Sequence, residues 1–95
     1  FEEWAFPQGE DARPYGMASD ASGKIWGVAT GVQPNMFMGF DPETEEWFSA
    51  TAVPSGGGTI RHMHYHKPSG AVWFGTDTNY IGRAIVEPEA MTDAP

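Results

Sequence analysis

A pattern that occurs twice constrains this chain more than any other feature of its sequence. A Ser-Gly turn followed by a strand-like run with a tryptophan stands at 22–27 (SGKIWG) and again at 69–74 (SGAVWF), 47 positions later. A short strand-like stretch precedes each turn, at 15–19 and at 61–65. Because a repeat that cannot bury its apolar residues alone needs a stacked neighbour, this self-similarity predicts small packed units.

The repeat has two more parts. Residues 38–40 recur at 81–83, and the Glu-Glu-Trp stretch 2–6 recurs at 45–49, both 43 positions apart. A period in the forties with four short strands per unit is typical of β-propeller blades. The expected strands are 2–6, 13–19, 24–30, 36–41, 45–50, 59–66, 71–76 and 79–86. The sequence therefore predicts an all-β chain with two four-stranded antiparallel blades, at 13–50 and 59–86.

Composition and turn residues favour the same assignment. Aromatic residues make up 14% of the chain, and Gly contributes 12 residues and Pro 8, a mixture that suits many short strands. Asp41-Pro42-Glu43-Thr44 is typical of a type I turn, which predicts a hairpin of strands 36–41 and 45–50. Gly56–Gly58 is expected to be a flexible crossing between the blades, and 87–95 a loose tail. No segment has apolar residues at helical spacing, so no helix of consequence is expected.

The order of the strands predicts how such a chain is completed. Stretch 2–6 has the pattern of an outermost strand but no blade of its own, while the second blade lacks its outer strand. We expect one two-blade unit over 1–95, in which 2–6 is donated to a neighbouring chain and a ring closes only by oligomerisation. A homotrimer would give six blades and a homotetramer eight, and we favour the trimer. The alternative is a part of a longer single-chain propeller.

Charge and composition exclude some partners. The net charge is −8 and the five basic residues are scattered, so nucleic-acid or anionic-membrane binding is not expected, since both need clustered positive charge. No apolar run approaches the length that spans a bilayer. Without cysteine, disulfides and thiol chemistry are excluded. The chain opens at Phe1 rather than Met, so a removed leader stays open, and with it the compartment, cytoplasmic or periplasmic.

Several stretches resemble the blade repeat of the virginiamycin B lyase (streptogramin lyase) family. They are 3–7 (EWAFP), 13–17 (RPYGM), 23–26 (GKIW), 70–74 (GAVWF) and 81–83 (IGR). The resemblance implies a propeller whose relatives are seven-bladed single chains. It also implies a metal-dependent elimination that opens a lactone ester, with Mg²⁺, a catalytic His and nearby carboxylates at one mouth of the channel.

Carried over by position, the resemblance assigns candidate catalytic residues. His62 stands where the family has its catalytic His, at the start of an inner strand, and Gly16 has this place in the first repeat. Asp77 is the candidate for the family's assisting acid, a few residues after the blade tryptophan. A second family acid would stand at Ile60, where this chain has no carboxylate.

The histidines and Arg61 raise further alternatives. His62, His64 and His66 alternate, so on a regular strand they share one face. With Asp77, His62 and His64 are candidate ligands of a metal, Mg²⁺ by resemblance, or there is none. Arg61 is a candidate for binding an anionic ligand, or it pairs with a carboxylate. Asp77 is equally explained as a solvated turn residue.

Two functional classes therefore stay open. One is a lyase or lactonase in which His62 and Asp77 meet around a divalent cation, from neighbouring blades or chains. The other is a non-catalytic propeller ring that binds a protein, or a small molecule in its central channel, or is purely structural. Trp4, Trp26, Trp47 and Trp73 recur at equivalent positions of the repeats, so we assign all four to packing.

Overall fold

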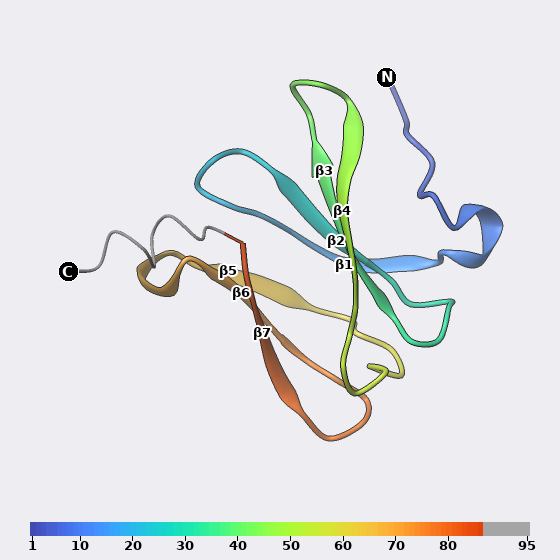
Figure 1. Cartoon of the computed structure of the whole chain (residues 1–95), viewed down its shortest axis with the longest axis vertical. Coiled ribbons are helices and arrows are strands. Elements are labelled where there is room, and N and C mark those ends of the chain that lie inside the picture. Colours follow the sequence, from blue (N-terminus) through green and yellow to red (C-terminus); the bar gives the residue numbers. More distant parts are fainter. Residues whose placement is uncertain (87–95) are drawn as a thin grey trace.

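The computed structural model describes residues 1–86, and it is all-β with two antiparallel sheets. A four-stranded sheet, in the order β1-β2-β3-β4, is followed along the chain by a three-stranded sheet, β5-β6-β7 (Figure 1). The strands are β1 (Pro14–Ser19), β2 (Ile25–Ala29), β3 (Met36–Asp41), β4 (Glu46–Ala52), β5 (Met63–His66), β6 (Ala71–Gly75) and β7 (Ile81–Ile85). Within each sheet, every strand pairs with the next along the chain, which makes both sheets meanders.

The all-β prediction is confirmed, and six of the seven strands end within two residues of the expected bounds. The exception is β5, which covers only Met63–His66 of the expected range 59–66. The helical residues form two single turns, η1 (Gly9–Asp11) and η2 (Lys67–Ser69). Stretch 2–6 forms no strand in the single chain, and the expected tail at 87–95 lies outside the described residues. No helix within residues 1–86 has the length and apolarity to cross a membrane.

The predicted hairpin of β3 and β4 is confirmed, with a loop one residue longer than a type I turn needs. The Asp41 side chain accepts a hydrogen bond from the Glu43 amide at 2.9 Å, and the Glu45 amide donates to the Asp41 carbonyl at 2.8 Å. Glu45 takes a φ of 59° to close the loop. The Asp-Pro start fixes the turn by local bonds, which is why the sequence alone located this hairpin.

Strand pairing corrects the repeat alignment at its third strand. Trp26 lies opposite Gly39, and its counterpart Trp73 lies opposite Arg83. The spacing from β3 to β7 is therefore 44, and Gly39 corresponds to Arg83 rather than to Gly82. The two glycines are alike for another reason: a Cβ at Gly39 would meet the Trp26 ring at 2.6 Å, and one at Gly82 would meet the Phe74 ring at 2.6 Å.

The core lies between the two sheets. The first sheet contributes Trp26, Val28 and Phe37, which are 6%, 0% and 6% exposed, and the second contributes Val72, which is fully buried. The apolar residues that pack against this cluster are Ala18, Met63, Tyr65, Phe74, Ala84 and Val86. Since side chains alternate along a strand, the other face of the first sheet points away from this core.

The N-terminal segment covers that other face. Ring centroids of Trp4 and Phe40 are 5.5 Å apart, and those of Phe6 and Trp47 are 4.5 Å apart. The Trp47 indole donates a hydrogen bond to the Ala5 carbonyl at 2.9 Å. The four-stranded sheet thus lies between the N-terminal segment and the three-stranded sheet (Figure 1).

Candidate functional site

Arg61 and Asp77 are brought together at one end of the three-stranded sheet. Arg61 precedes β5, and Asp77 lies in the turn between β6 and β7. The Arg61 guanidinium Nη1 is 3.2 Å from Asp77 Oδ1, and these side chains are 54% and 43% exposed. An ion pair this exposed contributes little stability. The sequence left two roles open for Arg61, binding an anionic ligand or pairing with a carboxylate, and in the structure Arg61 pairs with the carboxylate of Asp77.

His62 is near a tyrosine rather than Asp77. Its ring meets that of Tyr15 edge-on at 6.4 Å between centroids, and within residues 1–86 it has no ion pair with a carboxylate. Gly16, the counterpart of His62 in β1, has a steric role instead. A Cβ on Gly16 would lie 2.9 Å from the Arg61 carbonyl oxygen, so the close approach of β1 to the backbone just before His62 explains why the first repeat has glycine at this place.

The other two histidines lie on the exposed face of β5, where His64 and His66 alternate with the half-buried Met63 and Tyr65. His66 is engaged locally, since its Nδ1 is 2.9 Å from Ser69 Oγ. Across the described part of the chain, no three His, Asp or Glu side chains are grouped to hold a metal ion. Within residues 1–86, His62, His64 and Asp77 are therefore not gathered into one ligand set.

Asp20, which the sequence reasoning missed, organises the turn between β1 and β2. Its Oδ1 accepts hydrogen bonds from the Ser22 amide and hydroxyl at 2.9 and 2.6 Å and from the Lys24 amide at 3.1 Å. Its Oδ2 accepts one from the Trp26 indole at 2.8 Å. Burial alone would raise the pKa of Asp20, but the bonds from Ser22, Trp26 and Lys24 outweigh it and lower this pKa. The signal was available, because Asp two residues before a donor is typical of an Asx-turn.

The lowered pKa of Asp20 predicts a pH dependence of stability. The ionised carboxylate stabilises the fold above the ordinary Asp pKa of about 3.9, and this contribution is lost as pH falls through the lower folded-state pKa. We expect Asp20→Asn to lower the free energy of unfolding by about 1.5–3 kcal/mol at pH 7, since charge-assisted bonds are lost. Urea unfolding at pH 7 and pH 3 should show the difference from the parent shrinking in acid. The exposed Asp11→Asn is the matched control, and an equal effect of both substitutions would contradict the role of Asp20.

Asn35, which was also missed, joins the two sheets. It is fully buried, its Nδ2 donates to the carbonyls of Val32 at 3.1 Å and Gly58 at 3.0 Å, and its Oδ1 accepts from the Ile60 amide at 3.2 Å. Gly56–Gly58 wraps around it with φ values of 87°, 82° and 61°. The expected flexible crossing is therefore a hydrogen-bonded loop around a buried amide.

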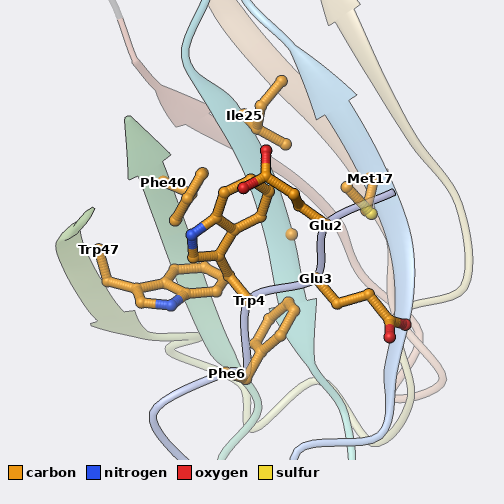
Figure 2. A pocket seen from close by; sticks show the side chains of 9 residues that line it. Glu2, Glu3, Trp4, Phe6, Met17, Ile25, Phe40 and Trp47 are labelled. Carbon is orange, nitrogen blue, oxygen red and sulfur yellow. The ribbon is translucent and has the colours of Figure 1, made fainter. Parts of the chain in front are cut away.

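The aromatic pocket under the N-terminal segment has a volume of about 280 Å³. Figure 2 shows its apolar wall, in which Trp4 and Phe6 of the segment meet Phe40 and Trp47 of the sheet, with Glu2 and Glu3 at its rim. The wall continues with Ile25 and with Met17, which is 61% exposed. The pocket is a partly uncovered sheet face rather than a site with convergent polar groups.

Comparisons with models of protein families, with curated proteins and with solved structures each give no match to this chain. The fold and the site therefore define the class of protein only as an all-β protein of two packed antiparallel sheets.

Proposed function

We propose that this chain is a two-blade unit of a β-propeller and that its copies associate head to tail into a non-catalytic ring, which holds a ligand or serves as a structural scaffold. The resemblance to virginiamycin B lyase blades and the two successive meanders support this reading. Its main support is a difference in exposure between equivalent positions of the two sheets.

The outward face of the second sheet lacks the cover that the first sheet has. Phe37 and Ile81 are equivalent, since they lie opposite Val28 and Gly75, which are 47 positions apart. Phe37 is 6% exposed against the second sheet, whereas Ile81 is 77% exposed. Trp26 is likewise buried and its counterpart Trp73 only half-buried. A third sheet stacked on this face would bury Trp73 and Ile81, just as the second sheet buries Trp26 and Phe37.

The far face of the first sheet is also less covered than the equivalent face of the second sheet. Met63 packs into the core between the sheets, while its counterpart Met17 is 61% exposed on the far face of the first sheet. The exposed face of the second sheet, which includes Ile81, and the exposed face of the first sheet, which includes Met17, thus belong to the same chain. Copies that meet through these two faces make a heterologous contact, which closes into a ring when the rotation allows. Three copies would give six blades and four would give eight, and we favour three.

The mass of the native protein tests this proposal. We expect the parent chain to have a mass of three or four copies, and Ile81→Asp to be a monomer, because a charge would be buried without a partner. Thr44→Asp, in the exposed β3–β4 turn, is the matched control and should keep the parent mass. A parent chain that stays monomeric at high micromolar concentration would refute self-assembly and favour the longer single-chain propeller.

A lyase is the second candidate, and the ion pair of Asp77 with Arg61, the residue directly before His62, favours it. If the ring is an enzyme, we expect Mg²⁺-dependent opening of a cyclic depsipeptide that is lost in His62→Ala, since a general acid or base contributes about 10²–10⁴-fold. His66→Ala, whose ring lies 2.9 Å from Ser69 Oγ at the other end of β5, is the control. Activity that survives His62→Ala would remove this residue from the mechanism, and an inactive assembled parent would leave the non-catalytic ring.

A further inference from the structure

A cleft of about 300 Å³ opens between the outer parts of the two sheets. Its wall includes Trp26, Phe37, Ser49, Phe74, Ala84 and Ile85. It lies beside β7, whose outer edge has no partner strand among residues 1–86. In the first sheet, the fourth strand β4 occupies the corresponding edge and brings Trp47 against Phe40 at 5.1 Å between ring centroids.

We propose that this cleft receives Trp4 of a second copy, as residues 2–6 of that copy add to β7 as its fourth strand. The inference rests on the proposed ring and adds its contact surface and register. Stretch 2–6 repeats the first part of β4, with Trp4 equivalent to Trp47 and Glu3 to Glu46. An unpaired strand edge is a ready template for such an addition.

The internal hairpin gives the register. Phe40 lies opposite Trp47, and Asp41 lies opposite Glu46. Since equivalent positions of β3 and β7 are 44 residues apart, Phe40 corresponds to Ala84 and Asp41 corresponds to Ile85. Trp4 of the incoming copy therefore lies opposite Ala84, on the side of β7 that faces the cleft, and Glu3 lies opposite Ile85. The small side chain of Ala84 leaves room where the first sheet has Phe40.

The chain cannot satisfy this edge with its own N-terminal segment. That segment lies on the side of the four-stranded sheet away from β7 (Figure 1). It is also well placed to reach a preceding copy. The Ala5 carbonyl accepts a hydrogen bond from the Trp47 indole, and Phe6 contacts Gly27. The counterparts of Phe6 and Gly27 in the repeat are Ser49 and Phe74, which both line the cleft. Residues 5 and 6 can keep these contacts while Trp4, which is 44% exposed, exchanges Phe40 for the cleft of the neighbour.

Disulfide crosslinking tests the register, because the chain has no cysteine of its own. Directly opposed residues of antiparallel strands have Cα atoms about 4.5–5.5 Å apart, within the range of a disulfide. We expect oxidised Glu3→Cys/Ile85→Cys to give covalent multimers on a non-reducing gel, up to the number of copies in the native mass of the parent. Each single variant should give no species larger than a dimer.

A control out of register separates strand pairing from simple proximity. In Glu3→Cys/Arg83→Cys the two positions are diagonal neighbours about 7–8 Å apart, beyond the usual disulfide range, so we expect at least tenfold less multimer. Native mass of each reduced variant shows whether it still assembles. If the parent is a ring and the in-register pair forms no more multimer than the control, the register is wrong and the ring stands. A crosslink within one chain also overturns the inference, and a monomeric parent overturns both proposals.

Discussion

Trp26→Ala should lower the free energy of unfolding by about 3–5 kcal/mol, the usual cost of removing a large buried aromatic side chain. Trp26 is 6% exposed, stacks on Phe37 at 5.0 Å and meets Phe48 edge-on at 5.2 Å between ring centroids. Its indole also supplies the bond to Asp20 Oδ2, so the substitution removes a core contact and leaves a buried carboxylate oxygen without its donor. Urea unfolding followed by circular dichroism measures the loss.

Trp73→Ala is the matched variant, since it removes the equivalent ring of the second repeat. Trp73 is half-buried, its indole donates to Ser69 Oγ at 3.1 Å, and Arg83 lies 5.8 Å over its ring. In dilute monomer its loss should therefore cost less than that of Trp26. If copies assemble as proposed, the two losses should become similar at concentrations where they do, because the neighbouring copy would bury Trp73. A Trp26→Ala variant with the unfolding midpoint of the parent would contradict its place in the core.

The strands could be predicted because the features that define them are local. The Asp-Pro turn of the β3–β4 hairpin and the Ser-Gly turns each act within a few residues. The register of β7 was not accessible in this way. Gly39 and Gly82 stand in similar sequence surroundings, but each makes room for a different aromatic ring on the adjacent strand. A shift of one residue exchanges the two faces of a strand, so an alignment at 43 positions would assign the side chains of β7 to the wrong faces.

The candidate site was less predictable, because its contacts join distant parts of the chain. Arg61 reaches Asp77 across 16 residues, and this distance depends on how the loop before β5 is held. The turn after β1 shows that similarity between the repeats can also hide a difference in hydrogen bonding. Trp26 donates to Asp20, whereas the equivalent Trp73 donates to Ser69, since Lys67 stands in the place of Asp20. The same indole is satisfied in two ways, so similarity of the repeats did not reveal Asp20.

The second large effect is expected at Asn35. Asn35→Ala should lower the free energy of unfolding by about 3 kcal/mol, because each buried backbone group left without a partner costs about 1–3 kcal/mol. The groups are the Val32 and Gly58 carbonyls and the Ile60 amide. They come from the β2–β3 loop of the first sheet and from the connection between the sheets, so the loss should loosen the contact between the sheets as well as the loop. Asn35→Asp should cost at least as much, since a carboxylate is similar in size but has no N–H to donate.

Gln33→Ala is the control that isolates burial as the cause. Gln33 Nε2 donates to the same Gly58 carbonyl at 2.8 Å, but from an exposed position, so water can replace it and the cost should stay below about 1 kcal/mol. Urea unfolding compares the three variants, and hydrogen exchange at the Ile60 amide reports on the loop directly. The amide should lose protection in Asn35→Ala, which removes its acceptor, and keep it in Gln33→Ala. Equal costs for Asn35→Ala and Gln33→Ala would mean that the inter-sheet loop is held by its glycine conformations and the β1–β5 contact, and that the buried amide is not what joins the sheets.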